Sequence, residues 1–443
     1  MKTRNLNRGS RGRAKALVST LVLFSLATAT ELAAPVTATP RHADPYVKGA
    51  TLLLEKAAPR LLGSEMDNPE LAPLCEAWQA LPREVVRYPT VRSNHTLHVA
   101  IHRTPRSPDQ PILVLLHGLL SDHLTWEYVA AELGHDYELW LVDLPGCGDS
   151  DAPLPRAIES GGYSPTAMGE RVLQALQLCL QTEPLAPSRH LTLVGHSLGG
   201  TVSIRMMSAP ELRERYWGVV QRVDRMVLFA PSDLAISSVP PKFLKLLGLE
   251  GWKVSVAQGL GVWDSRVRDL TLANYHRPEC ATREQQGRYA HVLKDRGHRE
   301  AAKAMLLNFV RFDPQAFRPV WPCIDALVAD YRNINVPVLI AHGAWDETLS
   351  VAMGHKLKNQ IPGAWLVEIP RSSHALPTEQ PSTCADLIRR FATGSGGLTV
   401  PPGSELTVYP DSPAARPGPT EFSRLGIRVD ADSFGGDAKG KLP

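Results

Sequence analysis

The sequence predicts an α/β fold built on a doubly wound, mostly parallel β-sheet, with a helical insertion between two strands. Short apolar runs recur along the chain, and most lack the alternation of strands that face water on one side. Segments with the period of an α-helix lie between several of these runs. The 443 residues are 43% hydrophobic and 21% charged, which provides ample material for a large core.

The predicted strands begin with an alternating pair and continue with buried runs. Residues 84–91 and 96–103 alternate around the turn-forming pair Ser93-Asn94, which predicts two strands joined by a turn. Helical periodicity covers 165–181 and 350–360. The runs without alternation, which predict strands buried on both faces, are 111–118, 138–142, 190–194, 225–230, 337–341 and 364–369.

Three segments depart from this alternation of strands and helices. Residues 39–83 are expected to form an N-terminal extension with one or two short helices. Residues 232–336 are helix-like, and roughly a hundred residues are too many for a bare connection, so they predict a folded insertion. The core is then 84–231 and 337–393. The tail, 394–443, is rich in Gly, Pro and Ser and is predicted to be disordered.

The N-terminus has the pattern of a signal peptide. Six basic residues and no acid precede or adjoin Ala16–Ala29, a stretch of fourteen residues without a charge. A membrane-spanning helix needs about 20 residues, so this stretch favours a signal-peptide core. Small residues suit cleavage after Ala29 or Ala38, and 1–38 is therefore predicted to be a leader for export to the periplasm or outside the cell. An uncleaved membrane anchor and a disordered basic tail on a cytosolic protein are the alternatives.

Charge and cysteine content restrict the function classes. Removing residues 1–29 changes the formal net charge from +3 to −3, because six basic residues leave with them. The remaining body has no basic surplus to bind nucleic acid. The six cysteines show no zinc-ligand spacing, which argues against a structural metal. Cys280 and Cys323 lie in the same insertion and could form a disulfide. No obligate protein partner is inferred.

A G-x-S-x-G pattern, Gly195-His196-Ser197-Leu198-Gly199, ends one of the buried runs. A serine hydroxyl becomes nucleophilic when a base takes its proton, and a sharp strand-to-helix turn exposes that hydroxyl above the sheet. Flanking glycines fit because the two backbones nearly touch there. The same turn aims the N–H of Leu198 at developing negative charge. Alone, the pattern arises by chance in roughly one chain in ten of this length.

Three other positions support a catalytic interpretation. The loop 117–120 follows an earlier buried run, and Leu119 can offer a second N–H to an oxyanion, with Leu120 as the alternative donor. Asp346 and His374 each come just beyond a later run. Active sites of open α/β sheets lie at the carboxyl ends of the strands, where the side chains of Ser197, Asp346 and His374 are all expected. The chain order Ser, Asp, His is the order expected for this architecture.

With these motifs, the chain resembles the α/β-hydrolase family from about residue 84 to 393. The likeness includes the His-Gly loop at His117, the turn 143–150 and the H-G-x-x-D segment that ends at Asp346. It further implies that the insertion 232–336 is a cap over the active site.

The resemblance implies a role for each candidate residue. Ser197 is the nucleophile, His374 the general base and then acid, and Asp346 the residue that orients the imidazole. Glu347 and Asp233 are rival acids. Relatives with dehalogenase or epoxide hydrolase chemistry use an aspartate nucleophile, so a serine argues against both.

Other polar residues near the motifs receive structural interpretations. His196 is expected to pack away from the neighbouring serine, and His117 to shape the oxyanion loop. Asp143 and Asp149 are expected to hold their turn through local hydrogen bonds.

The expected reaction is acyl transfer to water, which requires no metal or organic cofactor. Apolar residues in 243–252 and 260–263 would suit an acyl pocket or contact with a lipid surface, or they form the cap's own core. The expected substrate is a small, moderately hydrophobic carboxylic ester. Amide or peptide cleavage and carbon–carbon bond hydrolysis use the same triad and are the alternatives within enzymes. A catalytically idle binding protein is the alternative outside them.

Overall fold

The computed structural model describes residues 68–105, 110–182, 185–186, 189–232, 246, 248–309, 312–313, 318–319, 329–393, 398 and 405–410. The leader, 1–38, and the rival acid Asp233 lie outside the described residues, so export and cleavage stay predictions. Cys280 is a free thiol, whereas Cys323, its suggested partner, lies outside the described residues. Within the described ranges, no helix is both long and apolar enough to cross a bilayer.

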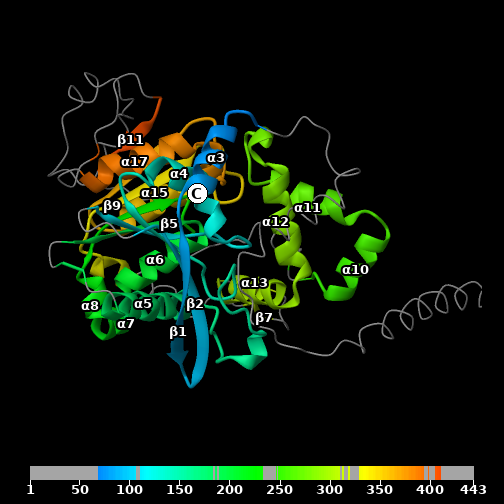
Figure 1. The fold of residues 1–443 in the computed structure, drawn as a ribbon, viewed down its shortest axis with the longest axis horizontal. Helices are drawn as coiled ribbons and strands as arrows, with labels where there is room; N and C mark the ends of the chain where they lie inside the picture. The colour runs from blue at the N-terminus through cyan, green and yellow to red at the C-terminus, as the bar shows by residue number, and fades with distance from the viewer. Residues whose placement is uncertain are drawn as a thin grey trace, which may run out of the picture.

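A nine-stranded sheet lies at the centre of the molecule, in the order β1-β2-β4-β3-β5-β6-β9-β10-β11 (Figure 1). Neighbours from β4 to β10 in this order are parallel, while β1, β2 and β11 pair antiparallel. The predicted doubly wound, mostly parallel sheet is therefore confirmed. The strands are β1 (Glu84–Arg92), β2 (His95–Arg103), β3 (Ile112–Leu116), β4 (Glu138–Val142), β5 (Leu191–His196), β6 (Val223–Phe229), β9 (Val338–Gly343), β10 (Ala364–Ile369) and β11 (Thr407–Tyr409).

Helices cover both faces of the sheet, so a central strand such as β3 is buried along its whole length. Ile112, Val114 and Leu116 face one apolar cluster, and Leu113 and Leu115 face the other. The first cluster includes side chains of α5 (Pro165–Thr182), α6 (Leu198–Ser208) and α15 (Val351–Gln360). The second includes side chains of α3 (Ala72–Ala80), α4 (Glu127–Leu133) and α17 (Pro381–Thr393).

The remaining core elements are short and connect these helices and strands. The hairpin turn at Ser93 and Asn94 has φ values of 46° and 66°, as expected for the predicted turn pair. The short elements are η2 (His123–Trp126), η3 (Pro155–Ala157), α7 (Pro210–Arg215), α8 (Trp217–Val220), η5 (Asp330–Asn333) and α16 (Leu376–Glu379).

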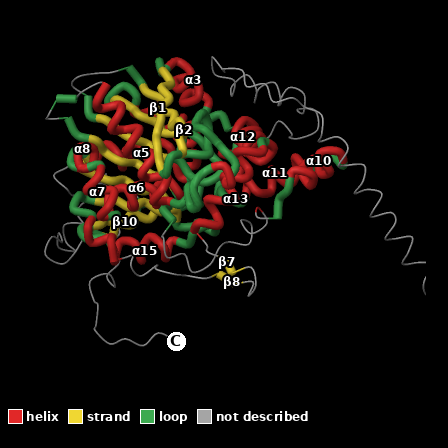
Figure 2. The backbone as a smooth tube through the Cα atoms, turned by 90° about the horizontal axis from the view of Figure 1, so that it is seen from below, coloured by secondary structure: helices red, strands yellow, loops and turns green. Residues whose placement is uncertain are grey.

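In the described part of the chain, four α-helices lie between β6 and β9 in sequence and beside the sheet in space (Figures 1 and 2). These inserted helices are α10 (Gly251–Gly259), α11 (Trp263–Leu272), α12 (Arg283–Lys294) and α13 (Arg296–Phe309). The same segment contains η4 (Pro278–Cys280) and two short strands that pair with each other, β7 (Phe312–Asp313) and β8 (Arg318–Pro319).

The inserted helices pack around an apolar cluster that also includes Leu120 of the core loop 117–120. Trp263 packs there with Val254 and Val292. Leu246 also belongs to this cluster, whereas Trp252 and Leu260 are exposed. Among the described residues, the apolar runs 243–252 and 260–263 are therefore divided between the core of the insertion and its exposed surface, so contact with a lipid surface stays a prediction.

The C-terminal tail is not disordered throughout, and the prediction for 394–443 is wrong for one part of it. Residues Thr407–Tyr409 form β11, which pairs antiparallel with β10. Val408 is buried there, together with Leu406. Three residues of high β-propensity are enough to join an existing sheet edge, because the partner strand supplies the ladder. Most other tail residues lie outside the described part of the chain.

Candidate active site

Ser197 lies at a sharp turn between β5 and α6. Its φ is 51° and its ψ is −116°, a conformation that is strained for a residue with a side chain. The backbone N–H of Ser197 donates to the carbonyl oxygen of Phe229 at the end of β6, at 2.9 Å. The turn is therefore held in place by the neighbouring strand, as expected for a nucleophile elbow.

Two glycines allow the strand and the helix to approach each other at this turn. A Cβ atom on Gly195 would lie 2.6 Å from the Cα atom of Gly200. A Cβ atom on Gly199 would lie 2.2 Å from the carbonyl oxygen of Leu116. Both contacts are with backbone, which cannot rotate away, so the pattern requires glycine at both positions.

The structure brings the three predicted site residues together. The Nε2 atom of His374 lies 2.9 Å from the Oγ atom of Ser197, and its Nδ1 atom lies 2.8 Å from Oδ2 of Asp346. All three residues are buried, and they follow β5, β9 and β10 in the chain. They form a hydrogen-bonded line at the carboxyl ends of three neighbouring strands.

The Asp346 carboxylate is fixed by its own loop. Its Oδ1 atom accepts hydrogen bonds from the backbone N–H groups of Thr348 at 2.7 Å and Leu349 at 2.8 Å. Burial opposes its charge, but His374 and His342 outweigh burial and hold the pKa of Asp346 well below its usual range. The rival acid Glu347 is exposed, and the carboxylate bonded to Nδ1 of His374 is that of Asp346.

His196 does more than fill space beside the serine. Its Nε2 atom donates to the backbone carbonyl oxygen of His374 at 2.8 Å. Burial, together with the nearby His374 ring, lowers the pKa of His196 to about 3. The ring is therefore neutral at ordinary pH and holds the backbone of His374 in place. The sequence predicted only packing, because adjacency to the serine does not reveal the direction of the ring.

The loop that carries the predicted oxyanion donor Leu119 passes directly over the elbow. A Cβ atom on Gly118 would lie 3.2 Å from the Cβ atom of Ser197, and Leu119 lines the same cavity as that serine. Leu198, the other predicted donor, is the first residue of α6, where helix N–H groups have no intrahelical acceptor. The alternative donor, Leu120, has a φ of 62°.

His117 shapes this loop, as the sequence suggested. Its Nδ1 atom donates to the carbonyl oxygen of Gly118 at 2.8 Å, and its Nε2 atom accepts from the N–H of Leu144 at 3.0 Å. Both ring nitrogens are thus engaged with backbone. Burial lowers the pKa of His117, which favours the same neutral ring.

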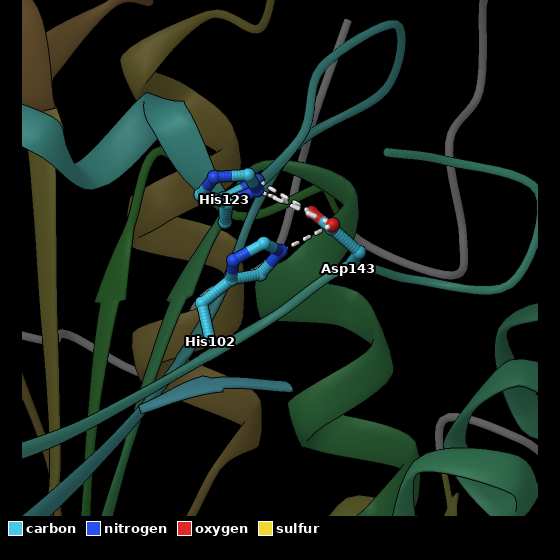
Figure 3. A group of neighbouring side chains, drawn as sticks. All are labelled: His102, His123 and Asp143. Atoms are coloured by element: carbon cyan, nitrogen blue, oxygen red, sulfur yellow. Dashed lines mark hydrogen bonds and ion pairs between the residues drawn. The ribbon is translucent and has the colours of Figure 1, made fainter. Parts of the chain in front are cut away.

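A buried cluster of two histidines and one aspartate ties this loop to the sheet (Figure 3). Asp143 accepts from Nε2 of His102 at 3.0 Å and from Nδ1 of His123 at 3.1 Å. It also accepts from the N–H groups of His123 and Asp149. Burial opposes charge on His102, but Asp143 and then Asp149 raise the pKa of His102 to about 9. Asp143 therefore holds its turn as predicted, through a buried ion pair that the sequence did not reveal.

The geometry of this cluster fits an ion pair better than a metal site. Its three side chains bring their ligand atoms within 4.8 Å of one another. However, the two imidazole rings are stacked, with centroids 3.5 Å apart and an interplanar angle of 19°. Imidazole binds a metal in its ring plane, so two stacked rings direct their lone pairs side by side rather than at one point. Two backbone N–H groups already occupy the carboxylate.

A cavity of about 60 Å³ adjoins Ser197 and His374. One wall comes from core loops, including 118–122. The other comes from the inserted segment and is mostly polar: Leu270, Asn274, Tyr275, Gln285, Arg288 and Tyr289. Among the described residues, no member of the apolar runs 243–252 and 260–263 lines it.

Comparison with known proteins places this fold in a family. Residues 113–387 match the model of the alpha/beta hydrolase family. The chain belongs to that family, and it is a hydrolase. The matched residues include the turn at Ser197, the loops of Asp346 and His374, and the insertion that precedes those two loops.

The chain is similar to hydrolases of several bacteria. It is 29% identical over 295 residues to a pimeloyl-[acyl-carrier protein] methyl ester esterase of Nitrosospira multiformis, covering 64% of this chain and 94% of that one. It is 22% identical over 292 residues to an uncharacterized hydrolase of Bacillus subtilis, covering 65% and 91%. A solved 2-hydroxy-6-oxo-6-phenylhexa-2,4-dienoate hydrolase from Rhodococcus sp. strain RHA1 shares the fold, with a TM-score of 0.51, 19% identity, and coverage of 70% and 100%.

Proposed function

We propose that the protein is a serine hydrolase that cleaves a small carboxylic ester through an acyl-enzyme intermediate. The observation that carries the proposal is the hydrogen-bonded line from Ser197 Oγ through His374 to Asp346, with distances of 2.9 and 2.8 Å. A strained serine on a glycine-flanked turn and an imidazole within hydrogen-bonding distance of its hydroxyl group are the parts that nucleophilic catalysis needs.

In the proposed reaction, Ser197 Oγ attacks the ester carbonyl carbon while His374 Nε2 takes its proton. Asp346 stabilises the imidazolium that forms, and the N–H groups of Leu119 and Leu198 bind the oxyanion. His374 then gives its proton to the departing alcohol. Water, activated by the same imidazole, attacks the acyl-enzyme and releases the acid. No residue in this sequence of steps needs a metal or an organic cofactor.

An ester is the preferred substrate class because a relative of 29% identity is named as a methyl ester esterase. The expectation of a moderately hydrophobic ester depends on apolar runs that are absent from the described cavity wall. The small volume supports a short substrate group, and the surface of the cavity is more apolar than polar, which keeps a moderately hydrophobic ester as the proposal.

Labelling with a fluorophosphonate probe tests the nucleophile. We expect the wild-type chain to be labelled, and Ser197→Ala and His374→Ala to lose most labelling while remaining folded by circular dichroism. Folded wild-type protein that resists the probe would favour the idle binding protein instead.

A substrate panel then separates the reaction types. It contains short and long p-nitrophenyl esters, an aminopeptidase substrate and a diketone. We expect the short esters to be cleaved fastest. Faster cleavage of the peptide or the diketone would reassign the reaction while leaving the nucleophile in place.

A further inference from the structure

One aspartate and one arginine line the cavity beside Ser197, and the arginine already has an ion-pair partner behind the cavity wall. Arg288, on α12, donates to both carboxylate oxygens of Glu127, at 2.7 and 3.3 Å, and lies 3.4 Å from Glu284. Asp122 lines the same cavity and forms no ion pair with the described residues. The guanidinium group of Arg288 is thus paired with Glu127, so the carboxylate of Asp122 has no ion-pair partner among the described residues.

Asp122 has one oxygen committed to its own loop and one available. Its Oδ1 atom accepts from the backbone N–H of Leu124 at 2.9 Å and so caps η2. Its Oδ2 atom accepts no hydrogen bond from the described residues, although the residue is only 3% exposed. Because Asp122 lines the cavity, this oxygen is available to accept a hydrogen bond from a ligand or a water molecule there.

A second unpartnered group lies on the opposite wall. Tyr289, the residue after Arg288, lines the cavity, and its hydroxyl group has no hydrogen-bond partner among the described residues. Burial raises the pKa of Tyr289 to about 12, so the phenol stays protonated and can both donate and accept.

The balance of charge in this region is negative. Burial opposes the charge on Arg288, yet Glu127 and then Asp122 raise its pKa above the usual range. In a partly buried site such a field attracts a positive or hydrogen-bond-donating group and repels an anion.

We propose that Asp122 and Tyr289 form a recognition site for a protonated amine, or another hydrogen-bond donor, on the substrate. In this arrangement, Oδ2 of Asp122 accepts from the substrate group and the Tyr289 hydroxyl provides a second contact. A substrate carboxylate would meet an unpaired carboxylate and is disfavoured. This inference rests on the proposed ester hydrolase function.

Three ethyl esters of nearly equal size test the proposal on the acyl side: ethyl butyrate, β-alanine ethyl ester and monoethyl succinate. Their acyl chains end in a methyl group, an ammonium and a carboxylate. A matching series of acetate esters varies the charge on the alcohol side. Hydrolysis is followed by the acid released in a pH-stat at pH 7. We expect kcat/KM for the amine ester to exceed that for the carboxylate ester by about ten-fold or more in at least one series.

Asp122→Asn is the decisive variant, because asparagine caps a helix as well as aspartate does while it removes the negative charge and one acceptor oxygen. It should reduce the ratio of kcat/KM for the amine ester to that for the carboxylate ester by about ten-fold, with the neutral ester measured in each variant as the reference. Tyr289→Phe should slow the amine ester alone. Asp269→Asn, which removes an exposed carboxylate from α11, is the matched control and should leave all ratios unchanged.

The outcomes separate this proposal from the proposed function. If wild-type protein reacts with the fluorophosphonate but has the same kcat/KM for the neutral, amine and carboxylate esters in both series, the recognition site is overturned and the hydrolase mechanism is not. The recognition site is also overturned if Asp269→Asn changes the ratio of amine to carboxylate ester kcat/KM as much as Asp122→Asn does. Protein that fails to react with the probe at Ser197 would overturn the hydrolase mechanism itself. Circular dichroism and thermal unfolding confirm that each variant is folded.

Discussion

The Nε2 atom of His196 and the backbone carbonyl oxygen of His374 lie 2.8 Å apart and share a hydrogen bond. The residue before the serine thus holds the main chain of the histidine whose side chain reaches that serine at 2.9 Å. Two consecutive residues therefore hold His374: His196 bonds to the backbone of His374, and Ser197 bonds to the ring of His374. In the proposed mechanism, the alignment of Ser197, His374 and Asp346 therefore depends on a side chain that is not assigned to proton transfer.

Replacing His196 with alanine should lower kcat for a short ester by about ten-fold, because the His374 backbone loses a donor and the imidazole is less well placed. The shape of the pH–rate profile should not change, since a group with a pKa of about 3 does not titrate in the working range. His196→Gln, whose amide can still donate, should recover part of the activity. A changed pH profile in the alanine variant would mean that His196 exchanges a proton.

Replacing Asp346 with asparagine should lower kcat by about 10³- to 10⁴-fold, because the amide can no longer stabilise the imidazolium or select its tautomer. The pKa of Asp346 is held well below its usual range, so this carboxylate stays ionised at neutral and mildly acidic pH. Glu347→Gln is the control, since Glu347 is adjacent but exposed. Equal losses in the two variants would mean that the wrong acid has been assigned.

Gly199→Ala should destabilise the fold by about 3 kcal/mol or more, because the new methyl group would lie 2.2 Å from the carbonyl oxygen of Leu116. Thermal unfolding measures the effect. Gly259→Ala on α10 is the matched control: no atom lies within 4 Å of its Cβ position, and the change should be neutral or stabilise by up to about 1 kcal/mol. Similar unfolding temperatures for both variants would contradict the close approach at the elbow.

The His102–Asp143 pair should make stability depend on alkaline pH. A folded-state pKa of about 9 for His102 lies above its ordinary value of 6.5, so the stabilisation is complete below about pH 6.5 and is lost as pH rises through about 9. The shift corresponds to about 3 kcal/mol.

Urea unfolding of wild type and His102→Gln measures this contribution. The difference in unfolding free energy should be largest at pH 6 and shrink towards pH 10, whereas His135→Gln, at an exposed histidine, should show no such trend. A difference that grows with pH would contradict the ion pair.

Much of the fold could be predicted because buried parallel strands have a simple signature. The run that became β3 is apolar at every position, since both faces of that strand are covered. The triad could be predicted from chain order, because parallel strands carry their carboxyl ends to one edge of the sheet. Strand β11 could not be predicted, because the three residues Thr407–Tyr409 are too few to show strand alternation within a Gly- and Pro-rich tail.

The polar features around the site were hidden for a different reason. Asp122 and Tyr289 come from distant parts of the chain, and only the packing of the inserted helices against the core places them on one cavity. The bond from His196 to His374 likewise depends on a ring direction that sequence does not encode. The ion pair of His102 with Asp143 joins two separate strands and belongs to no local motif.

The two walls of the cavity come from different stretches of the chain: the bond-cleaving groups from loops of the sheet, and six lining residues from the segment between β6 and β9. The proposed triad therefore belongs to the core alone, whereas the proposed recognition site takes Asp122 from a core loop and Tyr289 from the inserted segment. An exchange of that segment by recombination would replace one half of the recognition site and leave the triad and Asp122 in place. Substrate preference can then change in steps while the reaction centre stays constant.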